Sequence, residues 1–329
     1  MNRRDVLRAA AALGSVSAWA RPAWSQTNAS IWPQKAIRWV VPYTPGGITD
    51  EVARTFGQHL QDAWGQSVVV DNRPGGASNI GNLAVAKATP DGYTLLLAAP
   101  PLATNPAMFE GKLGYDPLRD LQPVSHLLWN PNAIMVRADS PFRTIEELLK
   151  HARANPGKLS YGSAGIGTMN HLGGEMLKRA AGIDMAYVPY KGSAPVMQDI
   201  LGGSLPVASD NLATYVPQIR AGKIRALVVL GPARIAAVPD VPSMVDAGFH
   251  DFDATGWVGA SAPAGMPADV VEKLSAEMAR IARLPEIRKR FEDRGFALVG
   301  STPREFAALM QRESTKLQAL VRDLGLKAE

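Results

Sequence analysis

Strand and helix signals alternate along the chain from about residue 35, and this alternation limits the folds open to it. Residues 37–41 form a short apolar run typical of a buried strand, and the apolar residues that follow recur at helical spacing through Val52 and Phe56. Two further strand runs, 67–70 and 93–98, with a second helical segment between them complete a β-α-β-α-β pattern. Such a pattern predicts a parallel sheet with right-handed crossovers.

The alternation repeats in the middle of the chain and then gives way to helices. Strand runs recur between residues 133 and 230 and are separated by helical segments. In the tail, Thr302 and Glu305 around Pro303 form a capping box with proline at the first helical position, which predicts a long terminal helix. The sequence therefore predicts two α/β lobes.

The length of the chain supports the same division. Its 329 residues exceed the size at which a single core usually stops growing. The irregular stretches near 99–130 and 231–262 are candidate crossovers, and if both cross, the first lobe is built from both ends of the chain. We expect the first lobe to contain residues 26–127 and 251–329, and the second lobe to contain residues 128–250.

The first 25 residues have the features of a secretory signal peptide. A charged start with Arg3, Arg4 and Arg8 precedes a small-residue apolar stretch, 9–20, and the end at 23–25 fits the usual cleavage rule. The paired arginines resemble a twin-arginine export motif, and the twin-arginine and general routes both stay open. We expect cleavage near Ser25 and a mature protein outside the cytoplasm.

Composition excludes several classes of function. The chain has no cysteine, which excludes disulfides, thiol catalysis, iron–sulfur clusters and cysteine-ligated zinc. The formal net charge is +5, but four arginines and one aspartate in the first 25 residues supply three of these charges, and no basic stripe follows, so we expect no nucleic-acid partner. Five histidines without an HExxH motif argue against a metal site, and export argues against ATP or NAD. We expect no cofactor.

The most informative segment is 41–50, VPYTPGGITD, which links a buried strand to the start of a helix. Its two glycines let the backbone aim successive N–H groups into one concavity, and the helix N-terminus adds partial positive charge. This arrangement suits a carboxylate or a phosphate. Asp50 complicates the interpretation, because it could satisfy the helix dipole itself or bind a ligand amine or hydroxyl. A plain strand–helix turn also stays open.

Similar polar turns follow other predicted strands. They lie at 71–81, 160–168, 190–193 and 209–211. Ligands of open α/β sheets bind beyond the carboxyl ends of the strands, so we expect these turns and the first one to line a single cleft.

The sequence lacks the common catalytic templates. It has no GxSxG elbow and no P-loop, and the segment 165–170 fails GxGxxG at its last position. His171 and Glu175 lie one helical turn apart, which fits a structural hydrogen bond better than a metal or acid–base pair. Lys191 could contact an anion or be a solvated surface residue.

Several segments carry a family resemblance. Residues 42–50 with 53–54, 71–81, 90–94 and 187–192 resemble the Bug family, the TctC-like extracytoplasmic solute receptors of tripartite tricarboxylate transporters, and residues 202–203 and 262–267 also match. The resemblance covers essentially the whole mature chain. It implies a periplasmic binding protein of the type II-like, two-lobe kind, in which each lobe has a mixed, mostly parallel sheet flanked by helices and the ligand cleft lies between the lobes.

The resemblance also implies a set of binding residues. Family receptors hold a ligand carboxylate with the first strand–helix loop and bridging waters, while the opposite lobe adds a Gly/Ser/Thr loop and a later acidic position. The chain departs from the family at 75–79, where GGASN replaces the usual Gly-Ala-Gly-Gly pattern. The expected ligand-binding residues are Tyr43, Gly46, Gly47, Ile48, Thr49, Asp50, Ser78, Asn79, Ser163, Gly165, Thr168, Tyr190, Lys191 and Asp210.

The resemblance implies a monomeric solute-binding protein without catalysis. We expect it to capture a small carboxylate by hinge closure and to deliver it to a two-component membrane permease of the tripartite tricarboxylate type. One alternative is a sensory receptor for a carboxylate, and another is an enzyme that uses His171 and Asp210 as an acid–base pair. Citrate-like acids, C4-dicarboxylates, acidic amino acids and aromatic acids all stay open as ligands.

Overall fold

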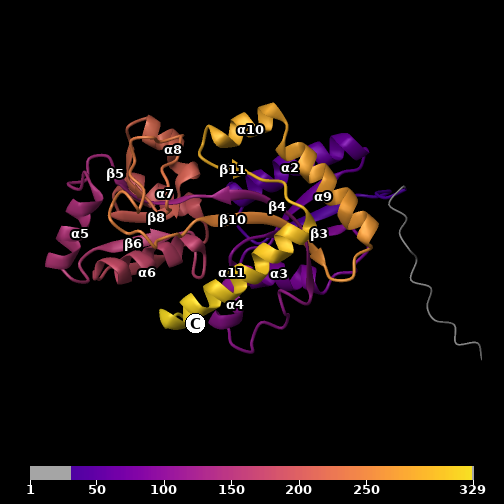
Figure 1. Ribbon diagram of the computed structural model, residues 1–329, viewed down its shortest axis with the longest axis horizontal. Coiled ribbons are helices and arrows are strands. Elements are labelled where there is room, and N and C mark those ends of the chain that lie inside the picture. Colours follow the sequence, from indigo (N-terminus) through magenta and orange to yellow (C-terminus); the bar gives the residue numbers. More distant parts are fainter. Residues whose placement is uncertain (1–30, 328–329) are drawn as a thin grey trace, which may run out of the picture.

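The computed structural model describes residues 31–327, which form two lobes lying end to end along the long axis of the molecule (Figure 1). The predicted signal peptide at 1–25 lies outside the described residues. Within residues 31–327, no helix combines the length and the apolar character needed to cross a membrane.

Each lobe is built on one sheet. In spatial order, the first sheet consists of β11 (Ala297–Leu298), β4 (Leu121–Asn130), β10 (Gly256–Pro263), β3 (Thr94–Ala98), β1 (Ile37–Val41) and β2 (Val68–Asn72). The second sheet consists of β7 (Ala186–Pro189), β6 (Ser160–Ser163), β8 (Val207–Asn211), β5 (Asn132–Arg137) and β9 (Ile224–Val229).

Both sheets are mixed. In the first sheet β1 pairs in parallel with β2 and β3, and in the second sheet β6 pairs in parallel with β7 and β8. The remaining pairings, made by β4, β5, β9, β10 and β11, are antiparallel. The two-lobe α/β fold with mixed sheets is thus confirmed, and the parallel pairing that the alternating pattern predicts is confined to the β-α-β units.

Helices cover both faces of each sheet. The first lobe has α2 (Ile48–Trp64), α3 (Asn79–Ala86), α4 (Pro101–Met108), α9 (Ala268–Ala282), α10 (Pro285–Glu292) and α11 (Pro303–Asp323). The second lobe has α5 (Ile145–Ala154), α6 (Met169–Ala181), α7 (Ser193–Gly202) and α8 (Leu212–Arg220). The predicted capping box is present at the start of α11, where Thr302 and Glu305 bond each other's backbone.

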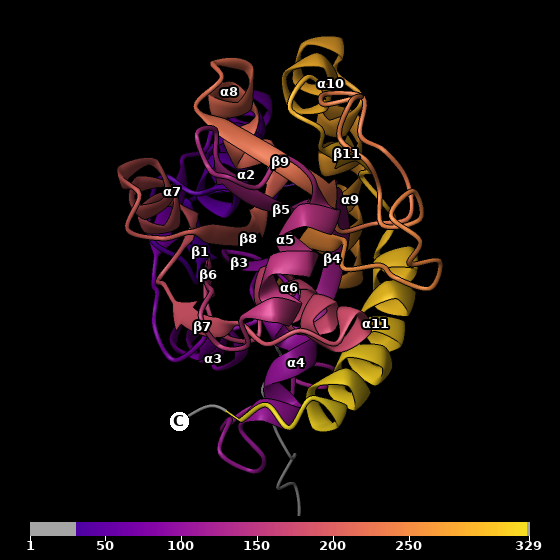
Figure 2. The same cartoon turned by 90° about the vertical axis from the view of Figure 1, so that its left-hand side faces the viewer.

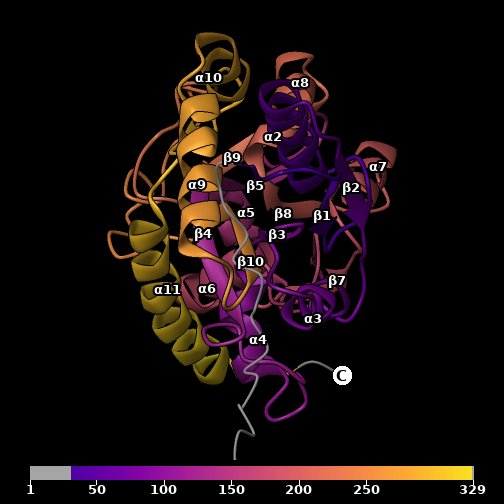
Figure 3. The same cartoon turned by 90° about the vertical axis from the view of Figure 1, so that its right-hand side faces the viewer.

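Alternate residues of the central strands pack on opposite faces, as a strand's two-residue period requires. In β1, Trp39 and Val41 join the cluster of α2, α9 and α10, whereas Val40 joins the cluster on the other face with residues of α4 and α11. In β5, Ile134 packs toward α5 and α6, and Met135 packs toward α7 and α8. Figure 3 views the first lobe, with β2 at the edge of its sheet.

The chain passes between the sheets twice, once at Pro131 between β4 and β5 and once between β9 and β10. The sequence pattern indicates irregular structure at 99–130 and 231–262. These stretches in fact contain α4, β4 and most of β10. Polar residues and Pro123 interrupt the apolar run of β4, and β10 consists largely of small residues buried on both faces. Neither strand therefore shows a two-residue alternation.

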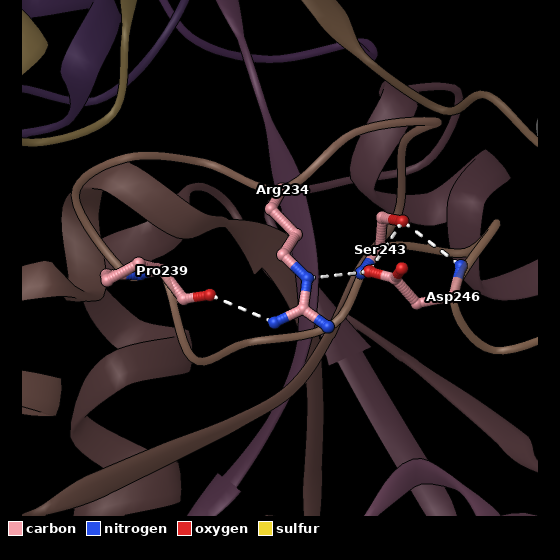
Figure 4. Close-up of polar contacts among 4 residues, drawn as sticks. All are labelled: Arg234, Pro239, Ser243 and Asp246. Carbon is pink, nitrogen blue, oxygen red and sulfur yellow. Dashed lines mark hydrogen bonds and ion pairs between the residues drawn. The ribbon is translucent and has the colours of Figure 1, made fainter.

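The return segment between β9 and β10 is held by polar contacts (Figure 4). Arg234 donates from Nε to Asp246 Oδ2 at 2.8 Å and from Nη1 to the carbonyl of Pro239 at 3.1 Å. Asp246 Oδ2 also accepts from the backbone N–H and the hydroxyl of Ser243. These bonds, the Ser243 N–H first among them, lower the pKa of Asp246. Side-chain contacts rather than a periodic apolar face thus order this segment.

The terminal helix α11 packs against both lobes (Figures 1 and 2). Phe306 and Leu309 in its first half belong to a core cluster of the first lobe. Leu317 and Val321 in its second half belong to a cluster that includes α5 and α6 of the second lobe. The lobes are therefore joined by α11 as well as by the two chain crossings. The residue boundaries of the lobes stay a prediction.

We predict that the fold loses stability in mild acid because two histidines are buried uncharged. Burial lowers the pKa of His126 and of His171 to about 4, from an ordinary value of 6.5. Each uncharged histidine makes its full contribution to the free energy of unfolding above pH 6.5, and this contribution is lost as the pH falls toward 4. At pH 5 the loss amounts to about 2 kcal/mol per histidine. Urea unfolding at pH 7 and pH 5 measures this loss.

The double variant His126→Gln, His171→Gln is the matched control, since it removes both titrating groups. Its unfolding free energy should change much less between pH 7 and pH 5 than that of the unaltered chain. Equal pH dependence in the two proteins would rule out the buried histidines as the cause.

Candidate ligand-binding site

A pocket of about 50 Å³, here called the first pocket, lies between the two lobes. The first lobe lines it with residues 47–49 of the loop that precedes and starts α2. The second lobe contributes residues 168–170 and Ser193, and the two chain crossings contribute Asn130 and Gly256. A molecule bound here would therefore touch both lobes and the segments that join them.

Five helices begin at the first pocket. The first residue of each of four helices lines this pocket: Ile48 of α2, Pro101 of α4, Met169 of α6 and Ser193 of α7. Asn211, which immediately precedes α8, lines it as well. Each helix N-terminus contributes partial positive charge. No lysine, arginine or histidine is among the residues that line the first pocket. Its attraction for anions thus comes from helix dipoles and backbone N–H groups.

The loop before α2 supplies free backbone donors. Among the described residues, the N–H groups of Gly47, Ile48 and Thr49 have no acceptor, and all three residues line the first pocket. Gly46 lies outside the lining, and its N–H donates to Asp50 Oδ2 at 3.1 Å. Three successive donors at a helix start can hold one carboxylate.

Asp50 is buried behind this loop and does not line the first pocket. Its Oδ2 accepts from Gly46 N and from Arg54 Nε at 2.9 Å. Burial raises the pKa of the Asp50 carboxyl, but the hydrogen bonds from Arg54 and Gly46 outweigh it, and the pKa is lowered. Of the two roles left open by the sequence, these contacts match the one in which Asp50 stabilises the start of its own helix.

Asp210 is fully buried beneath the starts of α6, α7 and α8 and does not line the first pocket. Burial raises its pKa, against the effect of four hydrogen bonds that its carboxylate accepts. Three of the donor residues, Asn170, Ser193 and Asn211, line the first pocket themselves, so Asp210 is linked to the pocket through them. The four donors are Asn211 N at 2.7 Å, Ser193 Oγ at 2.8 Å, Tyr215 Oη at 2.9 Å and Asn170 Nδ2.

A second pocket of about 320 Å³ adjoins the first, since Tyr43, Ala164 and Thr168 line both. Four predicted site residues line the second pocket alone: Ser78, Gly165, Tyr190 and Lys191. Burial raises the pKa of Tyr43 to about 12. The second pocket gives room for the far end of a ligand whose carboxylate lies in the first.

Asn79 and Ser163, also predicted from the sequence, line neither pocket. Asn79 Oδ1 accepts from Asn105 Nδ2 at 2.9 Å and from Tyr115 Oη at 3.0 Å. Ser163 Oγ lies 3.0 Å from Tyr187 Oη. These contacts hold the loops that carry the neighbouring pocket residues.

The acid–base pair of the enzyme alternative is not assembled. His171 Nδ1 accepts from Gly167 N at 3.3 Å, and its ring packs against Tyr187 with centroids 4.1 Å apart. Within the described residues no hydrogen bond or ion pair joins His171 to Asp210, and His171 lines neither pocket. Glu175 is bonded to Tyr161 Oη at 2.7 Å rather than to His171.

Most of the residues that line the first pocket are absent from the predicted ligand-binding residues; among those missed are Asn130, Asn170, Asn211, Gly256 and Trp257. Asn130, Gly256 and Trp257 belong to β4 and β10, which lie in the stretches interpreted as crossovers. Asn170 lies two residues after the predicted turn 160–168, and Asn211 is the last residue of the predicted turn 209–211. An asparagine at the start of a helix was an available signal for both.

The comparisons with known proteins show the family of the chain. The family profile described as "Tripartite tricarboxylate transporter family receptor", TctC, matches residues 52–326. The chain is similar to the periplasmic binding protein BugD, with 32% identity, coverage of 91% of this chain and 100% of that one, and a TM-score of 0.85.

Two similar solved structures carry small acids. A Rhodopseudomonas palustris protein with adipate is 31% identical, with coverage of 90% of this chain and 99% of that one and a TM-score of 0.86. MatC from the same organism, with bound malate, is 29% identical, with coverage of 88% and 100% and a TM-score of 0.82. The chain belongs to the TctC family of tripartite tricarboxylate transporter receptors, which are periplasmic solute-binding proteins.

Proposed function

We propose that this protein captures a small carboxylate in the first pocket and passes it to a two-component membrane permease. The observation that carries the proposal is the meeting of five helix N-termini at a pocket whose lining has no cationic side chain. The adipate and malate in similar structures support a carboxylate ligand.

The loop at 47–49 anchors the carboxylate. The free N–H groups of Gly47, Ile48 and Thr49 point to an anion held by backbone donors rather than by an arginine fork. Met169 and Asn170, at the start of α6, offer further N–H groups from the opposite lobe. The ligand thus completes contacts that neither lobe makes alone.

Capture proceeds by hinge closure about the two chain crossings. The lobes already touch at Thr44, whose Oγ1 donates to the carbonyl of Lys191 at 2.9 Å, and at Thr104, whose Oγ1 donates to the carbonyl of Gly167 at 2.9 Å. A ligand that binds both lobes favours the closed form, which the permease then recognises.

Family membership and the sequence support the remaining parts of the proposal. The receptor works in the periplasm as a monomer after its signal peptide is removed near Ser25, and it performs no catalysis. The family's transporter description supports the permease as partner. The separation of His171 from Asp210 supports binding without turnover.

A thermal-shift screen of residues 26–329 against a panel of carboxylates tests the proposal. A ligand at about a thousand times its dissociation constant stabilises the folded state by about 4 kcal/mol, which gives a clear shift. We expect at least one acid to raise the melting temperature and to be recovered unchanged. Binding confined to non-carboxylates, or turnover of the bound acid, would contradict the proposal.

A further inference from the structure

Two arginines join the lobes where α8 meets α10, at one end of the molecule (Figures 2 and 3). Arg294, which follows α10 in the first lobe, donates from Nε to the carbonyl of Ala213 in α8 at 3.4 Å. Arg220, at the end of α8 in the second lobe, donates from Nη2 to the carbonyl of Asp293 at 2.8 Å. Each lobe thus sends one arginine to a backbone carbonyl of the other, and this pair of contacts is here called the arginine bridge.

Both carbonyls lack the donor that a continuing helix would supply. A helical carbonyl accepts from the N–H four residues later, and for Ala213 that residue is Pro217, which has no N–H. Asp293 is the C-cap residue of α10, so no helical N–H follows to reach its carbonyl. A cation is also favourable at a helix C-terminus. The arginine bridge therefore satisfies acceptors that α8 and α10 leave open.

Arg294 is held in place by its own lobe. Its Nη1 lies 2.8 Å and 2.7 Å from the two carboxylate oxygens of Glu51 in α2, and its guanidinium carbon lies 5.5 Å from the ring centre of Phe296. Arg290 donates to the same carboxylate at 2.9 Å. The Arg294 and Glu51 side chains are only 25% and 24% exposed, so water screens their attraction less than it would at the open surface. Arg294 thus reaches across to α8 from a fixed position.

An apolar contact lies beside the arginine bridge. Ala213 has no exposed surface and belongs to the core cluster of the first lobe, together with Val52 of α2 and Phe291 of α10. The first turn of α8 is therefore packed into the core of the opposite lobe. Moving the lobes apart at this point would expose apolar surface and break both arginine bonds, and each of these changes costs free energy.

The helices that Arg294 joins also begin at the first pocket. Ile48, the first residue of α2, and Asn211, immediately before α8, line this pocket from opposite lobes. Arg294 contacts both helices within their first turn, at Glu51 of α2 and at Ala213 of α8. Its position therefore ties the spacing of one pocket wall to that of the other.

We propose that the arginine bridge holds the lobes at the spacing that the ligand needs, and that Arg294 and Arg220 are positioning residues for binding. The inference rests on the proposed function and goes beyond it, since neither arginine lines the first or the second pocket. A protein that spends less time in the binding-competent arrangement binds its ligand more weakly in the same proportion. Loss of the bridge thus weakens binding without removing a contact to the ligand.

The distance between the lobes can be measured directly, because the chain has no cysteine and introduced cysteines can be labelled alone. Ala276→Cys on α9 and Lys150→Cys on α5 place one spin label at an exposed position of each lobe. Double electron–electron resonance on the ligand-free mature protein should give one narrow distance distribution. Arg294→Gln should broaden it and add a second population at a different distance. Arg220→Gln breaks the bond from the other lobe and should do the same, so either variant suffices if the other fails to fold.

Titration calorimetry then measures affinity for the acid that gives the largest thermal shift in the carboxylate panel, with adipate and malate included in that panel. The affinity should fall about tenfold in Arg294→Gln and in Arg220→Gln, as expected if the competent arrangement drops to about a tenth of the molecules. Arg288→Gln is the matched control on the same helix, because the bonds of Arg288 to Glu292 and to the carbonyl of Leu298 stay within the first lobe. It should keep both the distance distribution and the affinity.

The outcomes separate this inference from the proposed function. Distances that stay unchanged in both variants would overturn the inference, whatever the ligand is. Broadened distances with unchanged affinity would overturn it as well, because the bridge would then not set the spacing of the pocket. Failure of every carboxylate in the panel to bind would overturn the proposed function, while the distances would still decide whether the bridge holds the lobes.

Discussion

Replacing Gly47 with valine is expected to abolish carboxylate binding while the fold stays intact. Gly47 has φ −84° and ψ 175°, an extended conformation open to any residue, and a Cβ there would meet nothing within 4 Å. Gly47 nevertheless lines a pocket of only about 50 Å³. The added side chain would occupy space beside the N–H groups of residues 47–49, where the carboxylate must lie.

We expect Gly47→Val to weaken binding at least about 100-fold, which corresponds to about 2.7 kcal/mol. Titration calorimetry measures the affinity, and circular dichroism with urea unfolding checks the fold. Gly202→Val is the matched control, because Gly202 also has free space around its Cβ but lies at the end of α7, outside both pockets. A folded Gly47→Val protein with normal affinity would show that the carboxylate does not lie at this loop.

Replacing Asp210 with alanine is expected to cost about 3–5 kcal/mol of unfolding free energy at pH 7, since it leaves several buried donors without an acceptor. The donors come from the starts of α6, α7 and α8, so the wall of the first pocket loosens as well. Urea unfolding measures the loss, and carboxylate affinity should fall with it.

Asp210→Asn provides the conservative comparison. Its oxygen can still accept from Asn170, Ser193 and the Asn211 N–H, and its amide can donate to the Tyr215 hydroxyl, which accepts as well as donates. We expect Asp210→Asn to retain most of the stability that Asp210→Ala loses. A loss below about 1 kcal/mol in Asp210→Ala would exclude a structural role for this network.

The sequence predicts the architecture well because both lobes depend on local periodicity. The spacing of Val52 and Phe56 gives one buried face of α2, and the capping box at Thr302 marks the start of α11. β4 and β10 escape prediction because they are buried on both faces and contain proline or small residues instead of alternating ones. Their place in the middle of the first sheet is set by tertiary contacts alone.

The candidate site is predictable at the level of loops but not of side chains. Polar turns after strands mark where helices begin, and α2, α6, α7 and α8, which follow such turns, begin at the first pocket. The glycine-rich turn at 71–81 lines the second pocket instead, and α3, which follows it, begins outside the first pocket. The sequence does not show which polar residues face the ligand, so Asp50 and Asp210 look like ligand contacts although both lie behind the pocket walls. Asn130 lies in a strand that the pattern does not reveal, and only the fold brings it to Asn211.

A crystal structure of the mature protein with its best-binding carboxylate tests the central claim most directly. The account predicts carboxylate oxygens within hydrogen-bonding distance of the N–H groups of Gly47, Ile48 and Thr49, with no arginine or lysine side chain on the carboxylate. A ligand held only in the second pocket, with its carboxylate paired to Lys191, would contradict it.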